Sequence, residues 1–150
     1  MTKPQETRSD AGLASTLRIS VSRLARRLRA ERQSAGLEPD LSDTQLAALA
    51  ALERHSAMTP GELADHEKVQ PPSMTRVITV LEERGLVVRA PHASDRRQVV
   101  LTVTDHGMEV VHQSRRLREA WLAKRLRELT PQERSALRAA APVLEKLSQS

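Results

Sequence analysis

Residues 71–84, PPSMTRVITVLEER, combine an apolar face with a face of small hydroxyls and one arginine. The apolar residues recur at the spacing of one helix side, i, i+3, i+4 and i+7, and are Met74, Val77, Ile78 and Leu81. The opposite side offers Ser73, Thr75, Arg76 and Thr79. Side chains of these types fit a DNA major groove, where they hydrogen-bond phosphates and base edges. In isolation the pattern favours an ordinary amphipathic helix with a solvated face, whereas the flanking segments favour a DNA-recognition helix.

A second, shorter helix is expected just before this one. Thr59 can cap it, Pro60 can take its first position, and Glu62 can reach back to the cap. These residues predict a helix over roughly residues 60–66, joined by a short connection to the helix at 71–84. Two helices joined by a tight turn, the second with a small polar face, form the helix-turn-helix arrangement.

A hairpin is predicted directly after the recognition helix. Gly85 is typical of a helix end, and the β-branched segments 86–90 and 98–104 are typical of strands. The segment between them, PHASDRR, is a polar tip with two adjacent arginines, Arg96 and Arg97. A narrow minor groove concentrates negative potential, so an arginine on such a wing can insert there. The alternative is a solvated, charged turn.

A long helix is predicted from Leu13 to about Arg32. Its apolar positions step by three or four and form a narrow seam of Leu13, Leu17, Val21, Leu24 and Leu28. The seam suits packing on another long helix, or on the core of its own domain. Residues 36–40 should break this helix, and the capping-box pair Ser42 and Gln45 should open the next one, which extends to about His55.

Two further helices are expected at the C-terminal end. Thr104 or Asp105 can cap a long helix that ends near residues 126–128. Residues 130–133, TPQE, repeat the capping chemistry of the start at Thr59 and open a last helix. Pro142 lies inside that helix and should kink or shorten it.

The predicted fold is mainly α with a small β-hairpin wing: a winged helix-turn-helix with long N- and C-terminal dimerisation helices. We expect a disordered N-terminus over residues 1–10, a helical dimerisation region over 11–36 and 105–148, and a DNA-binding domain over 42–104. A symmetric homodimer would cover the apolar faces of the long helices. It would also set two recognition helices about one DNA turn apart on a pseudo-palindromic operator.

Composition excludes several classes of function. The 150 residues carry a net charge of +5, contain no cysteine, tyrosine or phenylalanine, and have Trp121 as their one aromatic of the Phe/Trp/Tyr group. Base stacking on aromatics, as in single-strand and RNA platforms, is therefore not expected. No apolar run approaches the roughly 18 residues that span a membrane, and MTKPQETRSD has no apolar core of a secretory signal. A cytoplasmic location is expected.

The stretches VQPPSMTRVITVLEERGLVVR and PHASDRRQVVLTVTDHG resemble the MarR family of bacterial transcription regulators. The resemblance implies a homodimer that binds double-stranded operator DNA, with many members acting as repressors released by small ligands. It implies that residues 71–76 meet the major groove and that Arg97 meets the minor groove. The expected DNA-binding residues are Gln70, Pro71, Pro72, Ser73, Thr75, Arg76, Arg96 and Arg97. The resemblance also implies that Asp95 orients the wing arginines. A double proline after Gln70 departs from the family's more usual serine cap and single proline.

Other classes of protein have weaker support. An enzyme is not expected, because there is no cysteine nucleophile, no Gly-rich phosphate loop and no G-x-S-x-G turn. No cofactor is required by any motif. A metal-sensing regulator is an alternative in which Glu109 and His112 could share an ion, or else form a solvated pair. A winged helix used for protein contacts is the other alternative, although such a module does not need paired wing arginines.

A small organic anion is the expected inducer. The first helix carries Arg18, Arg23, Arg26, Arg27 and Arg29, and the long C-terminal helix carries Arg115, Arg116 and Arg118. These charges favour an anionic ligand where the long helices meet the winged domain, unless they are solvated or lie near DNA phosphates. The pocket walls should be aliphatic, with Trp121 available for stacking.

Overall fold

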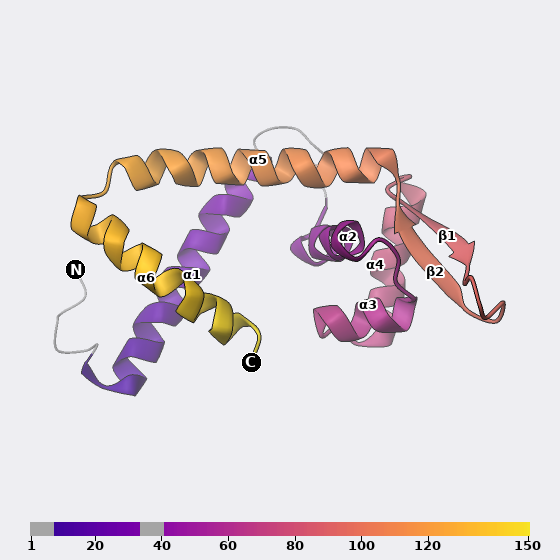
Figure 1. Cartoon of the computed structure of the whole chain (residues 1–150), viewed down its shortest axis with the longest axis horizontal. Helices are drawn as coiled ribbons and strands as arrows, with labels where there is room; N and C mark the ends of the chain where they lie inside the picture. Colours follow the sequence, from indigo (N-terminus) through magenta and orange to yellow (C-terminus); the bar gives the residue numbers. More distant parts are fainter. Residues whose placement is uncertain (1–7, 34–40) are drawn as a thin grey trace.

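Six helices and one antiparallel hairpin make up the described part of the chain, residues 8–33 and 41–150, in the computed structural model (Figure 1). The elements are α1 (Asp10–Gln33), α2 (Asp43–His55), α3 (Pro60–Glu67), α4 (Pro71–Glu83), β1 (Val87–Pro91), β2 (Val99–Val103), α5 (Asp105–Arg127) and α6 (Pro131–Ser148). This is the predicted fold class. Helix α1 begins three residues before the predicted Leu13. The predicted break over residues 36–40 lies outside the described residues. The sequence predicts a disordered N-terminus over residues 1–10; residues 1–7 lie outside the described residues, whereas Asp10 already belongs to α1.

Capping residues start the helices where the sequence predicts. The Ser42 hydroxyl accepts the Gln45 N–H at 3.1 Å, and the Gln45 side chain accepts the Ser42 N–H at 2.9 Å. The same reciprocal pair forms between Thr59 and Glu62 and between Thr130 and Glu133. Each box satisfies two backbone donors that a helix start leaves unpaired. The sequence predicts that Pro142 kinks or shortens the last helix; it does not shorten it, because α6 continues to Ser148.

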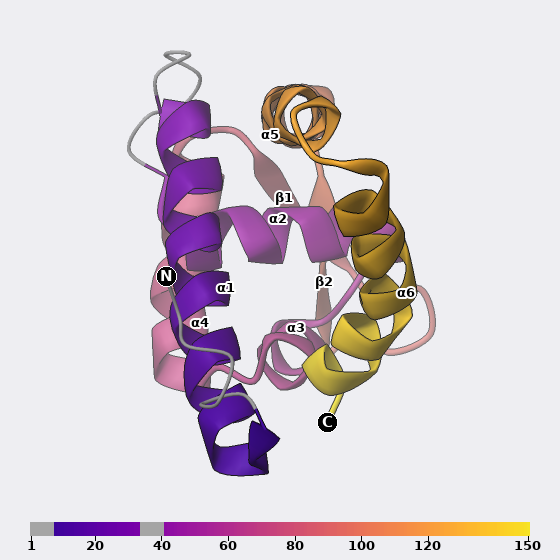
Figure 2. The same ribbon diagram turned by 90° about the vertical axis from the view of Figure 1, so that its left-hand side faces the viewer.

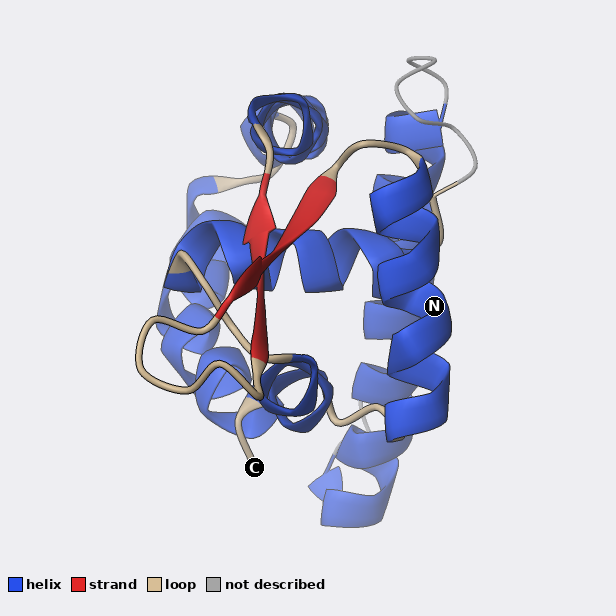
Figure 3. Ribbon diagram, turned by 90° about the vertical axis from the view of Figure 1, so that its right-hand side faces the viewer, coloured by secondary structure: helices blue, strands red, loops and turns tan. Residues whose placement is uncertain are grey.

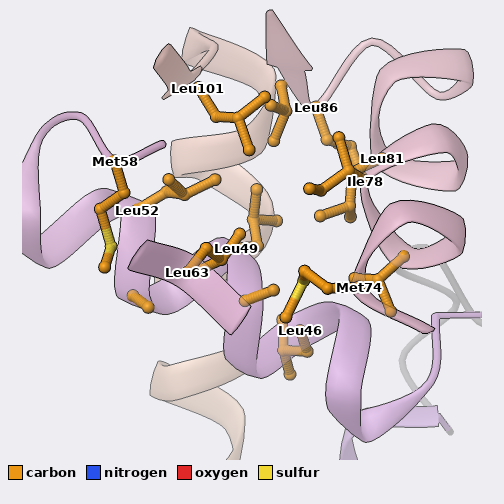
Figure 4. Close-up of a cluster of buried hydrophobic side chains, with 14 of the residues drawn as sticks. Leu46, Leu49, Leu52, Met58, Leu63, Met74, Ile78, Leu81, Leu86 and Leu101 are labelled. Carbon is orange, nitrogen blue, oxygen red and sulfur yellow. The ribbon is translucent and has the colours of Figure 1, made fainter. Parts of the chain in front are cut away.

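A hydrophobic core joins α2, α3, α4 and the hairpin into one lobe, hereafter the winged lobe (Figure 4). Leu49, Leu52, Leu63 and Leu81 are completely buried in it, and apolar burial of this kind is the main driving force for folding. The connection between α2 and α3 also joins the hairpin. Met58 donates its N–H to the Leu101 carbonyl at 3.2 Å and accepts the Leu101 N–H at 2.8 Å.

The long helix α5 connects the winged lobe to a second group of helices. It runs from the hairpin at one end of the molecule to α6 at the other, and α1 packs against it (Figure 1). In the view along α5, α1 and α6 both lie below this helix, on opposite sides of the molecule (Figure 2). The hairpin occupies the end of the molecule opposite α6 (Figure 3). The start of α5 therefore lies at the hairpin and its end at α6, so the length of α5 sets the distance between these two parts of the fold.

The start of α5 lies directly on the hairpin. The Thr104 hydroxyl donates to the Gly85 carbonyl at 2.7 Å and accepts the Gly107 N–H at 3.0 Å. A Cβ at Gly107 would lie 2.3 Å from the Leu86 carbonyl oxygen and 2.7 Å from Cγ2 of Val103. Because the first of these atoms is backbone, the approach requires glycine.

Gly107→Ala should therefore separate α5 from the hairpin and destabilise the protein. We expect a loss of about 1–3 kcal/mol, the usual range for overpacking, measured by urea unfolding. Gly61→Ala is the matched control, because the nearest atom to a Cβ there is Oγ1 of Thr59, at 4.0 Å. Equal stability of the Gly107 variant and the parent would show that this contact does not constrain α5.

Candidate nucleic-acid interface

The recognition helix α4 divides into a buried and an exposed face, as its sequence predicts. The four apolar residues Met74, Val77, Ile78 and Leu81 all pack into the core. On the other side, Gln70, Pro71, Pro72, Ser73, Thr75, Arg76 and Thr79 are exposed. The burial of one face fixes the rotation of the helix and presents the polar face to solvent.

Hydrogen bonding within α4 determines which exposed groups remain free to donate. The Thr75 hydroxyl donates to the Pro71 carbonyl at 3.0 Å, and the Thr79 hydroxyl donates to the Thr75 carbonyl at 2.9 Å. The Gln70 side chain makes no capping hydrogen bond, although Gln70 is the N-cap residue. The side chains with uncommitted donors on this face are therefore the amide of Gln70, the hydroxyl of Ser73 and the guanidinium of Arg76.

The wing is an ordered turn with exposed arginines. Asp95 accepts the Arg97 backbone N–H through Oδ1 at 3.0 Å, and its carbonyl accepts the Gln98 N–H at 3.0 Å. The side chains of Arg96 and Arg97 are exposed. Asp95 thus contacts the backbone that carries the arginines, which is the geometry that an orienting role requires.

The wing and the recognition helix belong to one rigid unit. The Arg89 side chain on β1 forms an ion pair with Glu82 on α4. Leu86, which follows α4, is completely buried and leads directly into β1. Figure 3 shows the two strands and the turn that joins them at the same end of the molecule. The two sets of predicted DNA contacts therefore lie on the same lobe.

Glu53 connects the winged lobe to α5. Its carboxylate lies 3.2 Å from Nε2 of His112 and 3.3 Å from Nη2 of Arg115. The hydrogen bond with His112 lowers the pKa of Glu53 from its usual value; burial opposes this shift and Arg115 adds to it. His112 thus pairs with Glu53, whereas Glu109 accepts a hydrogen bond from Gln113. Glu109 and His112, which the sequence offers as a possible ion-sharing pair, therefore have different partners. The partner of His112 lies 59 positions away in the sequence, so spacing along α5 does not indicate it.

Histidines elsewhere in the described ranges do not assemble a metal centre. The rings of His55 and His66 lie 5.0 Å apart, edge to face. Among residues 8–33 and 41–150, no group of three or more His, Cys, Asp or Glu side chains is arranged to hold a metal ion. The edge-to-face contact accounts for the histidine pair as a packing interaction.

A cavity of about 270 Å³ lies where α1, α2 and α5 meet. Arg29, Arg32 and Arg118 line it together with Asp43 and aliphatic side chains. Arg32 is buried and donates to the Leu41 carbonyl at 2.9 Å. Burial lowers the pKa of Arg32 from its usual value, and Asp43 opposes that shift. Sequence periodicity places Arg32 in the helix without indicating that it is buried.

The architecture defines a winged helix-turn-helix protein, and known proteins share it. A sequence profile of the MarR family matches residues 41–99. An uncharacterized HTH-type transcriptional regulator, Mb0904 of Mycobacterium bovis, is 49% identical over 136 residues, which cover 91% of this chain and 92% of that protein. The chain belongs to the MarR family. MarR-family proteins are DNA-binding transcription regulators and not enzymes, and the relatives of this chain are HTH-type transcriptional regulators.

Solved structures agree with this assignment. The crystal structure of RV1404 from Mycobacterium tuberculosis has a TM-score of 0.81 and 25% identity, and the match covers 92% of this chain and 94% of RV1404. A mutant MarR from Escherichia coli complexed with operator DNA has a TM-score of 0.66 and 23% identity, over 93% of this chain and 98% of that one. The second likeness shows the fold alone. None of the described helices is long and apolar enough to cross a membrane.

Proposed function

We propose that this protein is a ligand-responsive repressor that binds a pseudo-palindromic operator as a homodimer. One observation carries the proposal: the exposed donor face of α4 and the exposed arginines of the wing lie on the same rigid lobe. An α-helix fits the major groove, and an arginine fits the narrower minor groove beside it. The Escherichia coli MarR complex supports this, because a protein of the same fold binds operator DNA.

In this proposal, the position and type of each exposed side chain assign it to the major or to the minor groove. Ser73, Thr75 and Arg76 meet the major groove, together with the residues Gln70, Pro71 and Pro72 at the start of α4. Arg76 can form paired hydrogen bonds with guanine, and Gln70 can do so with adenine. Arg96 and Arg97 reach the minor groove or its phosphates, while Asp95 holds the turn. Residues 42–104 form the DNA-reading domain in this proposal.

The wing separates this proposal from a protein-interaction module. Within the described ranges, the side chains of Arg96 and Arg97 make no ion pair. Two neighbouring exposed cations are costly to bury in an apolar protein interface and favourable beside phosphates. DNA is the partner that this arrangement fits better.

Dimerisation would involve residues 11–36, described as far as Gln33, and residues 105–148. Leu13, Val21 and Leu24 of α1 are 43%, 51% and 43% exposed, and no residue of α6 is buried. A largely apolar cavity of about 590 Å³ lies between α1, α5 and α6 and includes Leu122, Leu137 and Leu144 in its lining. A second copy of the chain would cover these surfaces, because a closed symmetric pair is the commonest solution for such faces.

The cavity between α1, α2 and α5 is the proposed inducer site. Asp43 pairs with Arg29 and Arg32, but three arginines against one carboxylate leave the lining positively charged, which favours an anion. The aliphatic walls favour an organic one. The cavity lies between the winged lobe and the proposed dimer region. A ligand there can shift the spacing of the two lobes only by binding one spacing better than the other.

Arg97→Ala and Arg76→Ala should each weaken operator binding. We expect a loss of about 1–3 kcal/mol for each, because each removes a groove or phosphate contact. Fluorescence anisotropy on the best duplex selected from a random-sequence pool measures this at roughly 150 mM salt. Arg76→Ala on α4 should also change the preferred DNA sequence, whereas Arg97→Ala should not. Arg116→Ala, which removes an exposed arginine of α5, is the control. Unchanged affinity of Arg97→Ala would exclude the wing contact.

Leu144→Glu should convert the protein from a dimer to a monomer. Leu144 is 40% exposed in the single chain and lines the cavity between α1, α5 and α6. Burying a carboxylate without a partner opposes assembly. Light scattering at micromolar concentration should report twice 16.7 kDa for the parent and about that mass for the variant. Val88→Glu, at 50% exposure on β1 and outside the proposed dimerisation region, should remain dimeric. A monomeric parent would exclude an obligate dimer.

Salicylate should release the operator, and Arg118→Leu should reduce that response. A coupling of about 1–3 kcal/mol corresponds to a roughly 5- to 150-fold loss of DNA affinity. Anisotropy of the DNA reports release. Trp121 does not line this cavity, contrary to the expectation that it could stack on the ligand, so its fluorescence, with Arg27 and Arg125 over the ring, reports a change in the contact between α1 and α5. Arg116→Leu is the matched control on the same helix. Release by cationic or neutral compounds, and never by anions, would contradict the anionic site.

A further inference from the structure

The turn at the tip of the wing closes on one imidazole nitrogen. Nδ1 of His92 accepts the backbone N–H groups of Ser94 and Asp95, each at 3.2 Å. The Ser94 hydroxyl lies 3.2 Å from the same nitrogen. The His92 backbone donates in turn to the Gln98 carbonyl at 3.0 Å. His92 therefore joins the first residues of the turn to its end.

These contacts determine the protonation state of the ring. A nitrogen that faces two backbone N–H donors must present its lone pair, so the proton of neutral His92 lies on Nε2. Protonation at Nδ1 would place an N–H against two N–H donors. Both hydrogen bonds to the turn would then be lost, and the backbone groups of Ser94 and Asp95 would need other partners.

The same turn carries the wing arginines. Asp95, whose N–H is held by His92, accepts the Arg97 N–H through its carboxylate. The order of contacts is thus His92 to Asp95, and Asp95 to Arg97. Loss of the contact between His92 and Asp95 therefore loosens the backbone from which Arg96 and Arg97 project.

We infer that His92 is a positioning residue for the wing: its neutral ring orders the turn that aims Arg96 and Arg97 at DNA, and its protonation releases that turn and weakens operator binding. The inference rests on the proposed role of the wing in DNA binding. It extends that role by making operator affinity depend on pH.

The charged groups around His92 belong to its own turn. The hairpin tip projects beyond the helices (Figure 1), and the hydrogen bonds of His92 in the described ranges all lie within residues 92–98. The charged residues of this turn are Asp95, Arg96 and Arg97, and His92 contacts the first of them through the Asp95 backbone N–H. Bound DNA adds phosphates, which attract the imidazolium. Attraction of this kind would strengthen binding in acid, so the sign of the pH effect distinguishes it from loss of the turn.

His92→Asn provides the decisive comparison. The Asn side-chain oxygen is at the same position along the side chain as Nδ1, can accept the same two N–H groups, and does not titrate. Operator affinity of the full chain is measured from pH 8 to pH 5.5 at constant ionic strength for the parent and for His92→Asn and His92→Ala. The other histidines are present in all three proteins, so their effects cancel in the ratios.

We expect the parent to lose about 3- to 10-fold more affinity than His92→Asn as the pH falls, the equivalent of one or two hydrogen bonds. His92→Ala should bind weakly throughout, and His92→Asn should bind at pH 8 as the parent does. A parent-to-Asn ratio that is flat with pH, or that rises in acid, would overturn the inference.

Nitrogen NMR of the unbound protein tests the same contacts without DNA. Nε2 of His92 should carry the proton, and the amides of Ser94, Asp95 and Arg97 should shift together with the titration of this ring. A proton on Nδ1, or amides that ignore the titration, would overturn the inference even if the variants do not fold. Unchanged operator affinity of Arg97→Ala, with the amides still following His92, would instead refute the DNA role of the wing and leave the ordering of the turn intact.

Discussion

The hydroxyl of Thr104 is the contact on which the arrangement of this protein depends. By donating to the Gly85 carbonyl and accepting the Gly107 N–H, it joins the end of α4 to the start of α5 at one point. Gly85 itself has φ of +68°, a left-handed conformation that favours glycine and lets the chain turn from α4 into the hairpin. The backbone N–H of Thr104 also donates to the Leu86 carbonyl. Recognition helix, wing and connecting helix therefore cannot change direction independently.

The start of α5 is fixed to the hairpin by Thr104. In the proposed regulation, the contacts of the winged lobe with the long helices further along are therefore the ones that a ligand could alter. Glu53 of α2 pairs with His112 and Arg115 of α5. Arg32 reaches from α1 to the Leu41 carbonyl, just before α2. Both contacts join the winged lobe to the long helices beside the arginine-lined cavity. In the proposed regulation, a ligand in the cavity would act on these contacts between α1, α2 and α5, and would need no direct contact with α4.

The wing has a different kind of order. It has no hydrophobic core of its own, and its turn is held by polar contacts from His92 and Asp95. Hydrogen bonds of this kind each contribute a modest net free energy, so the turn can respond to a single protonation while the lobe beneath it stays folded. The two sets of proposed DNA contacts therefore differ in rigidity: α4 is fixed by burial, and the wing arginines by a few hydrogen bonds.

The amino-acid sequence by itself determined the helices, their caps and the exposed face of α4. Those features depend on neighbours within one or two turns, as the Ser42–Gln45, Thr59–Glu62 and Thr130–Glu133 pairs illustrate. Only the tertiary structure decided the bridge between Met58 and Leu101, the burial of Arg32 and the pairing of His112 with Glu53. The role of Nδ1 of His92 also escaped the sequence, although its partners are two and three residues away, because a histidine nitrogen acts as a cap only when the turn has the right geometry. Local capping and helix periodicity are encoded by spacing along the chain, whereas these contacts arise only once packing has brought distant segments, or a folded turn, into place.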